Sequence, residues 1–265
     1  MTAYTTLDIR RDGAVHWVTL NRPDSLNALN TTMVTELREY FGALPSDLET
    51  RVVVLRGSGR AFCAGLDLKE GGGGEIASVQ GMLRGQRRIS ELVMLMRRAP
   101  QPIIACVHGA ACGGGFALAL ASDVRIAGES ARLNAAFIRI GLSACDVGVS
   151  YFLPRLVGVS VASELLLTGR FIHAARALAT GLVSEVVADD QLETAARRLL
   201  DEMLSTSPVG LRLTKECLNA SIDAGSMEQV IAMEDRNQVL CTQTQDFREG
   251  VLAFLQKRAP QYSDQ

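Results

Sequence analysis

The glycine-rich stretch over residues 107–118 carries the groups of this chain that are best suited to chemistry. The apolar run Ile103–Val107 predicts a buried strand, and the three glycines at 113–115 are followed by residues that favour a helix. The first N–H groups of a helix have no partner inside it and lie at its positive end. Because glycine lets a ligand approach the main chain closely, we predict that the Gly114 amide points at an oxygen that gains negative charge. Tight packing of helix on strand is the alternative reason for the glycines.

A second stretch of this kind, over residues 60–70, also follows a buried strand, at residues 52–55. Its loop could supply a second amide, that of Leu66. Two N–H groups that converge on one oxygen form an oxyanion hole, which stabilises negative charge in a transition state. Together, the two stretches predict a reaction in which one oxygen of the substrate becomes negatively charged.

The elements that must position these amides follow from local patterns. Besides the strands already named, we predict strands at residues 7–11, 15–20, 123–126, 132–134 and 183–187. Helices are predicted at residues 31–44, 77–98, 161–167 and 174–180, and three or four more are predicted after residue 189. The segment 138–148 is rich in turns. Residues 71–74 form a break that is either a surface loop or a mobile wall of the substrate pocket.

The two glycine-containing stretches and their surroundings resemble the crotonase superfamily, also called the enoyl-CoA hydratase/isomerase family. The resemblance covers nearly the whole chain in six blocks, which occur in the family's order at residues 18–29, 62–68, 113–115, 166–170, 179–183 and 254–258. It implies an α/β fold, a spiral of ββα units with a C-terminal helical region that builds a homotrimer and often a dimer of trimers. We therefore expect a core with the acyl-CoA site over residues 1–190 and a helical region for trimerisation over residues 191–265.

The resemblance also implies an acyl-CoA thioester as substrate, with its carbonyl oxygen bound by the amides of Leu66 and Gly114. The other substrate and CoA contacts that we expect from the family pattern fall on these residues: Ser25, Leu26, Ala28, Ala64, Gly65, Asp67, Leu68, Phe137, Phe254 and Lys257. Phe254 and Lys257 would come from a neighbouring subunit and meet the adenine and a phosphate. Fixing its loop is the alternative role for Asp67, and helix packing is the alternative for Phe254. Apart from CoA as part of the substrate, no cofactor and no metal is expected.

This sequence departs from the family's hydratases, which use two glutamates. The corresponding positions hold Ala117, three residues after the middle glycine, and Phe137, four residues before the glycine of Ile140-Gly141. Neither side chain can move a proton. The departure counts against ordinary crotonase-type hydration.

One carboxylate remains nearby, that of Asp146 in the segment 141–148. The segment partly resembles the dienoyl-CoA isomerases, which carry an aspartate before Val-Gly. It also partly resembles the chlorobenzoyl-CoA dehalogenases, which carry a nucleophilic aspartate at the same distance before Arg-x-Val-Gly, here residues 155–158. We hypothesise that Asp146 is a single general base or proton shuttle, with a pKa that burial raises toward the working pH. A turn residue bonded to its own backbone is the alternative.

A single base is enough for the 1,3-proton shift that moves a double bond, whereas hydration needs coordinated delivery of hydroxide and a proton. The sequence therefore favours an enoyl-CoA isomerase of acyl-CoA and fatty acid metabolism over a hydratase. Two other functions stay open. One is a CoA-thioester hydrolase or dehalogenase with Asp146 as nucleophile, and the other is a CoA-binding paralogue without catalysis. Among weaker candidates, His108 is expected to be structural, Cys145 lacks an evident base, and Glu129 is expected at the surface.

The composition disfavours nucleic-acid and membrane partners. The 265 residues carry 27 Lys and Arg against 29 Asp and Glu, which gives a net charge of −2. No purely apolar run of about 18 residues predicts a membrane span, and the first residues lack the pattern of a secretory signal. The six cysteines form no Cys-x-x-Cys pair, so neither a zinc site nor a disulfide framework is indicated. A cytoplasmic enzyme with reduced thiols fits these features.

Overall fold

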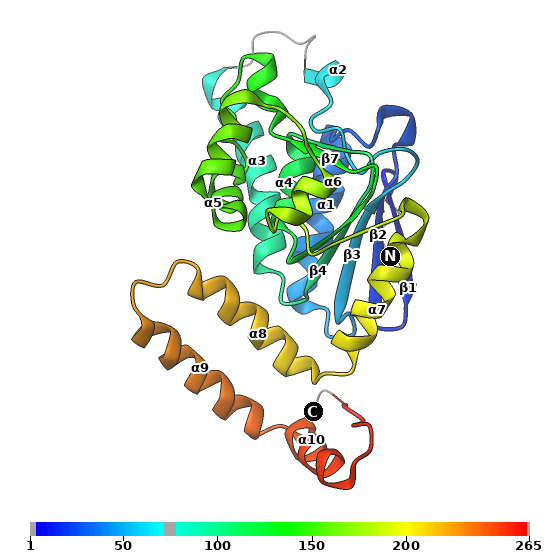
Figure 1. The fold of residues 1–265 in the computed structure, drawn as a ribbon, viewed down its shortest axis with the longest axis vertical. Helices are drawn as coiled ribbons and strands as arrows, with labels where there is room; N and C mark the ends of the chain where they lie inside the picture. The colour runs from blue at the N-terminus through cyan, green and yellow to red at the C-terminus, as the bar shows by residue number, and fades with distance from the viewer. Residues whose placement is uncertain (1–3, 72–77, 264–265) are drawn as a thin grey trace.

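A six-stranded sheet lies at the centre of the computed structural model, which describes residues 4–71 and 78–263 (Figure 1). Its strands lie in the order β1 (Leu7–Asp12), β2 (Val15–Leu20), β3 (Val52–Gly57), β4 (Ile103–Val107), β6 (Val124–Gly128) and β9 (Glu185–Val187). β1 and β2 pair antiparallel, and the other neighbours pair parallel. A smaller sheet holds β5 (Ala110–Cys112), β7 (Arg132–Asn134) and β8 (Ile172–His173).

The helices confirm the predicted α/β class. Their bounds are α1 (Thr31–Ala43), α2 (Leu68–Gly71), α3 (Val79–Arg98), α4 (Gly114–Ala121), α5 (Val149–Thr168), α6 (Ala174–Ala179), α7 (Leu192–Leu204), α8 (Pro208–Ser221), α9 (Met227–Thr242) and α10 (Gln245–Gln256). Short 3-10 helices lie at Pro23–Ser25, Leu44–Ser46, Ala136–Ile140 and Asp189–Gln191. The predicted break at residues 71–74 falls almost entirely outside the described residues.

Helices cover both faces of the large sheet, which explains why residues 52–55 of β3 and all of β4 are apolar. Alternate side chains of each strand point to opposite faces. Val53 and Leu55 pack with α1, α3 and α4, whereas Val52 and Val54 pack with α7. Figure 1 shows α7 on one side of the sheet and the other three helices on the opposite side.

The prediction for α5 was too short. A helix was expected at residues 161–167, but the structure has one that begins at Val149 and is interrupted only where Gly158 adopts φ 75° and ψ 159°. Pro154 and Gly158 both disfavour a helix locally, so the first half could not be recognised from propensity. Burial supplies the missing stability, because Val149, Phe152 and Leu153 belong to the core.

α5 is also, among residues 4–71 and 78–263, the one helix long and apolar enough to cross a membrane by length and composition. Side chains from both of its halves lie in the hydrophobic core: Val149, Phe152, Leu153, Ala162 and Leu165. α5 therefore packs against the hydrophobic core of the domain.

The C-terminal helices α8, α9 and α10 extend away from the sheet layers (Figure 1). They expose large apolar side chains, and Leu218, Met227, Phe254 and Leu255 are each 62 % or more exposed. α7, which precedes them, packs on the sheet instead. The division of the chain after residue 190 and the role of the C-terminal region in trimerisation stay predictions.

Glu193 fixes α7 to the sheet through two arginines and also pairs with a third arginine on α7 itself, and these contacts should be lost in acid. Its carboxylate pairs with Arg10 on β1 at 2.9 Å, Arg56 on β3 at 2.9 Å and Arg197 on α7 at 2.8 Å. These guanidinium groups, that of Arg10 foremost, lower the Glu193 pKa to about 2, although burial opposes the shift. A lowered folded-state pKa stabilises the protein above the unfolded pKa, and that stability is lost as the pH falls through the folded pKa.

We expect Glu193→Gln to lower the free energy of unfolding at pH 7 by about 1 kcal/mol or less, since the carboxylate is partly exposed and screened by water. The difference from the wild type should shrink as the pH falls from the ordinary glutamate value of 4.5 toward about 2. Thermal unfolding midpoints at a series of pH values measure this. Glu129→Gln, a change at an exposed glutamate, is the control. A difference that stays constant down to pH 3 would contradict the assignment.

Candidate active site

Three loops meet at one edge of the large sheet because β2, β3 and β4 are parallel neighbours. The loop after β3 runs beside the loop after β4, where the Phe62 amide donates to the His108 carbonyl at 2.8 Å and the Cys112 amide donates to the Cys63 carbonyl at 2.9 Å. The same loop also runs beside the one that follows β2, where the Leu29 amide donates to the Gly65 carbonyl at 2.7 Å. Residues 64–67 therefore lie between the other two loops.

This arrangement brings Leu66 and Gly114 together. A methyl group placed on Gly114 would lie 3.9 Å from the Leu66 nitrogen, and one placed on Gly65 would lie 3.5 Å from the Gly114 nitrogen. Within the described part of the chain, neither of these two amides donates a hydrogen bond to a protein carbonyl. Gly114 is the first residue of α4, at the positive end of that helix. The pair has the position and the free donors that an oxyanion hole requires, and its role stays a prediction.

The other two glycines of the turn allow its backbone conformation and its close packing. Tight packing was the alternative reason given for the glycines. Gly113 adopts φ 49° and ψ −115°, a conformation that residues with a side chain rarely adopt. A methyl group on Gly115 would lie 2.2 Å from the Cys63 carbonyl oxygen. Glycine at 115 thus permits the contact that holds the two loops side by side, while glycine at 114 leaves its amide accessible.

We expect Gly115→Ala to lower the free energy of unfolding by about 1–3 kcal/mol, because two backbone segments must separate to admit the methyl group. Gly42→Ala is the matched control. Gly42 lies in α1 with no atom within 4 Å of a methyl group placed on it, so that change should be neutral or stabilising by up to about 1 kcal/mol. Urea denaturation measures both. Equal stability of the wild type and Gly115→Ala would show that the loops are not in close contact.

Seven of the ten residues expected to contact the substrate or CoA lie at the same edge of the sheet. Leu26 accepts from the Ala64 amide at 2.9 Å, and the Asp67 amide donates to Leu29 at 3.0 Å. These bonds place the segments that hold the predicted contacts next to each other: Ser25, Leu26, Ala28, Ala64, Gly65, Asp67 and Leu68. The structure thus brings these seven residues together, and their contact with CoA stays a prediction.

Two polar residues that organise these loops were not predicted. The Arg22 guanidinium pairs with Asp67 at 2.9 Å and donates to the Ala28 carbonyl. It holds the Asp67 pKa below its usual value. This ion pair favours the alternative role of Asp67 in fixing its loop, and its contact with CoA stays a prediction. Buried Asn27 donates to the carbonyls of Ser58 and Ala61, both at 2.8 Å. Asn27 has a left-handed backbone, with φ 55°. The sequence does not reveal this conformation, so it gave no sign that Asn27 organises the loops.

A cavity of about 570 Å³ opens beside Leu66, between α1, the Leu66 loop and α3. Its lining is largely apolar and includes Leu29, Val34, Leu66, Leu68 and Ile89. Ala117 and Phe137, at the positions where the resemblance places the two glutamates of the hydratases, are both buried. The Phe137 ring lies 3.4 Å from a methyl group placed on Gly113. Apolar side chains, those of Ala117 and Phe137, therefore flank the glycine turn.

Asp146 lies between α3 and the start of α5. Its Oδ1 accepts from the Val147 amide at 2.8 Å and from the Gln86 side chain. Asp146 is half-buried, so it is less enclosed than the sequence led us to expect. The neighbour that α3 places against it is the polar side chain of Gln86. Val147 and Gly148 line a second cavity, of about 1080 Å³, between α3, α5 and α8. No described hydrogen bond joins Asp146 to Leu66 or Gly114, and its catalytic role stays a prediction.

Phe254 and Lys257 lie at the end of α10. Phe254 is 83 % exposed, so packing between helices does not account for it within one chain. It borders a cavity of about 630 Å³ between α8, α9 and α10, whereas neither residue lines the cavities beside Leu66 and Val147. Their contact with the CoA of a neighbouring subunit stays a prediction.

The weaker candidates have the surroundings expected of structural or surface residues. A ring nitrogen of His108 bonds the Gly59 carbonyl at 2.9 Å, and Glu129 and Cys145 are exposed. Burial raises the pKa of the Cys63 thiol to about 12, which keeps it protonated and inert. No group of three or more His, Cys, Asp or Glu side chains in residues 4–71 and 78–263 could hold a metal ion.

Comparison with known proteins identifies the family. The model of the enoyl-CoA hydratase/isomerase family matches residues 10–265. The probable enoyl-CoA hydratase EchA12 of Mycobacterium tuberculosis is 39 % identical over 254 residues, which cover 93 % of this chain and 88 % of that protein. The 1,2-epoxyphenylacetyl-CoA isomerase of Escherichia coli is 35 % identical, over 93 % of this chain and 94 % of its own.

A solved structure of the same family has the same fold as this chain. The crystal structure of an enoyl-CoA hydratase from Bacillus anthracis superposes with a TM-score of 0.93 at 34 % identity, over 98 % of this chain and 100 % of that one. The family assignment follows from the α/β architecture, the C-terminal helices and the match over nearly the full chain. This chain belongs to the enoyl-CoA hydratase/isomerase, or crotonase, family.

Proposed function

We propose that this chain is an enoyl-CoA isomerase, which moves a double bond in an acyl-CoA thioester. The observation that carries the proposal is the pair of adjacent amides of Leu66 and Gly114, which donate to no carbonyl within the described part of the chain. The thioester carbonyl oxygen would accept from both. Negative charge that builds on that oxygen would then be stabilised by the two donors and by the positive end of α4.

The proposed reaction is a 1,3-proton shift. The Asp146 carboxylate takes a proton from the carbon at one end of the allylic unit, and the electron pair moves through the double bonds onto the thioester oxygen. The resulting dienolate is held by the two amides. The Asp146 carboxylic acid then returns the proton to the carbon two positions away, which restores the carbonyl and leaves the double bond shifted. Mass and charge balance without another reactant.

The residues around the glycine turn favour this reaction over hydration. Ala117 and Phe137 offer no carboxylate to deliver water, so one acid–base group, Asp146, is proposed to serve both proton transfers. The relative from Escherichia coli is named as an isomerase of an epoxide rather than of an enoyl-CoA, so its name supports isomerase chemistry on a CoA thioester only in general. Other relatives are named as hydratases, among them a short-chain-enoyl-CoA hydratase of Clostridium acetobutylicum at 32 % identity, so hydration is the second candidate.

Incubation with a panel of 2-enoyl-, 3-enoyl- and dienoyl-CoA esters, followed by mass spectrometry and ultraviolet spectroscopy, separates the candidates. Unchanged mass with a shifted ultraviolet band supports the isomerase. A mass gain of one water identifies a hydratase, and release of free CoA identifies a hydrolase. No change across the panel favours a CoA-binding protein without catalysis and would overturn the proposal.

We further propose that the chain acts in the cytoplasm as a homotrimer or a dimer of trimers. The support is the exposure of apolar side chains on the C-terminal helices, such as Phe254 and Leu255, which a monomer would leave in water. Light scattering on the purified protein should give three or six times the chain mass of 28.5 kDa. A monomeric mass would contradict the assembly and the assignment of Phe254 and Lys257 to a neighbour's CoA.

A further inference from the structure

α4 carries the proposed oxyanion donor, and its own side chains fix its position by apolar packing alone. All eight of its residues are buried, and its sequence, GGFALALA, contains no polar side chain. Five of these residues are glycine or alanine, and the larger ones, Phe116, Leu118 and Leu120, lie in the hydrophobic core. The amide of Gly114 must nevertheless stay beside that of Leu66 for both to reach one oxygen.

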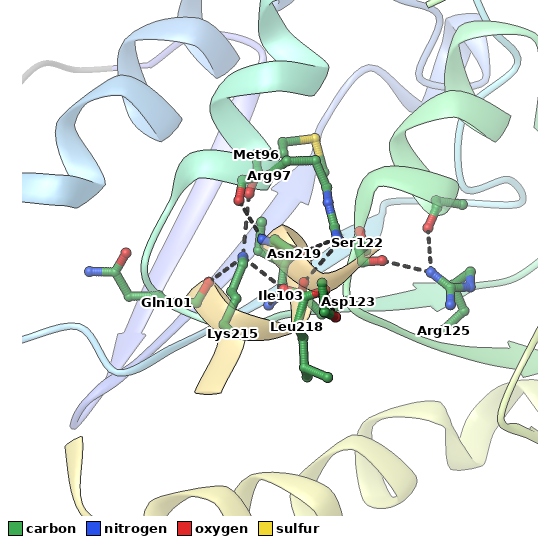
Figure 2. Close-up of polar contacts among 12 residues, drawn as sticks. Met96, Arg97, Gln101, Ile103, Ser122, Asp123, Arg125, Lys215, Leu218 and Asn219 are labelled. Atoms are coloured by element: carbon green, nitrogen blue, oxygen red, sulfur yellow. Dashed lines mark hydrogen bonds and ion pairs between the residues drawn. The ribbon is translucent and has the colours of Figure 1, made fainter. Parts of the chain in front are cut away.

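A buried arginine holds the opposite end of this helix. Arg125, on β6, is 8 % exposed. Its Nη1 donates to the carbonyls of Ser122 at 2.6 Å and Ala119 at 3.4 Å, and its Nε donates to Leu182 at 2.7 Å. Ala119 lies in the last turn of α4, and Ser122 is its C-cap. Figure 2 shows the guanidinium beside Ser122. Arg125 thus ties the end of α4 both to the sheet and to the segment before β9.

The charge of Arg125 is directed at carbonyls rather than at a carboxylate. The neighbouring Asp123 is already paired with Arg97 at 3.1 Å and with Lys215 at 2.7 Å, and it accepts from the Ile103 amide (Figure 2). Burial lowers the Arg125 pKa to about 10, so the side chain is charged at neutral pH. A cation at the carboxyl end is the arrangement that stabilises a helix.

We propose that Arg125 is a positioning residue for the oxyanion hole: by holding the carboxyl end of α4, it keeps the Gly114 amide next to that of Leu66. The inference rests on the proposed function of these amides. A helix of eight residues is about 12 Å long and moves as a rigid unit. Loss of the bonds at one end therefore shifts the amide at the other, and a displacement of about 1 Å can cost about 10²-fold in rate.

Lys215 offers a matched control. It is also a buried cation, 5 % exposed, whose ammonium donates to the carbonyls of Gln101 at 2.8 Å and Met96 at 3.3 Å. Lys215 thus contacts the end of α3 and pairs with Asp123. Within the described residues, it donates no hydrogen bond to a carbonyl of α4. Lys215→Met removes a comparable charge and loosens α8 without releasing α4, so it separates general destabilisation from misplacement of the donor.

The test compares Arg125→Met, Arg125→Lys and Lys215→Met with the wild type. The spectroscopic readout is the red shift of a bound conjugated thioester, 4-dimethylaminocinnamoyl-CoA, whose absorption moves as its carbonyl is polarised. We expect Arg125→Met to lose most of the shift and about 10²-fold in kcat, with KM changed less than about threefold. Arg125→Lys should retain part of both, and Lys215→Met should keep the shift.

An unchanged shift and kcat in Arg125→Met, or an equal loss in Lys215→Met, would overturn the inference. If Arg125→Met does not fold, Arg125→Lys decides by the same criteria, since an ammonium reproduces the charge but not the fork of donors. Absence of the shift in the wild type with the probe bound would instead refute the oxyanion hole itself, so the two failures are distinct.

Discussion

Replacing Gly114 by proline should lower kcat by about 10²–10³-fold relative to replacing it by alanine, because proline alone removes the N–H group that we propose as a donor to the thioester oxygen. Both substitutions add a Cβ, which would lie 2.9 Å from Leu29 Cδ1. That atom is the end of a flexible side chain and can move. The Cβ is common to both variants, so their difference reports on the N–H group and on the proline Cδ that takes the place of its hydrogen.

The position is suited to this comparison. Gly114 is the first residue of α4, where proline is tolerated because its missing N–H has no partner inside the helix. Thermal unfolding would verify that both variants fold. Steady-state kinetics on the substrate identified from the thioester panel give the ratio. Equal kcat values for the proline and alanine variants would mean that the Gly114 amide takes no part in the reaction.

Asp146→Asn should lower kcat by about 10²–10⁴-fold, the range expected when a general acid–base group is removed. Asparagine has nearly the same shape, and its oxygen can still accept from the Val147 amide, as Asp146 does at 2.8 Å. The turn should therefore persist while proton transfer is lost. A mere turn residue, the alternative role, would tolerate this change.

Exchange of substrate hydrogen with deuterated water provides a second readout for Asp146. The wild type should incorporate deuterium at the carbon that receives the proton to the extent that the Asp146 carboxylic acid exchanges with solvent before it returns the proton. Asp146→Asn should neither incorporate deuterium nor shift the double bond. Glu129→Gln, at an exposed glutamate, is the matched control and should behave as the wild type. Full turnover in Asp146→Asn on the true substrate would exclude it as the base.

Much of the fold could be predicted because it is encoded locally. The strand Ile103–Val107 has the predicted bounds, since an apolar run between Pro102 and a glycine turn leaves few alternatives. Asn30 caps α1 as expected, and its side chain accepts from the Met33 amide at 2.9 Å. The adjacency of Leu66 and Gly114 followed from two strand–loop units, which the parallel pairing of β3 and β4 places side by side.

The parts that could not be predicted depend on distant partners. β8 has two residues and forms only by pairing with β7. Arg22 and Arg125 look like ordinary charged residues in the sequence, and their roles depend on carbonyls of other segments. The partial exposure of Asp146 likewise depends on Gln86 of α3, 60 residues away along the chain. Side-chain contacts over such separations leave no periodic signal.

A crystal structure with a bound saturated acyl-CoA, which an isomerase cannot convert, tests the central claim most directly. It should show the thioester carbonyl oxygen about 2.7–3.1 Å from the nitrogens of both Leu66 and Gly114. A carbonyl oxygen directed elsewhere, with either amide bonded to the protein's own carbonyls, would contradict the oxyanion hole and the reaction built on it.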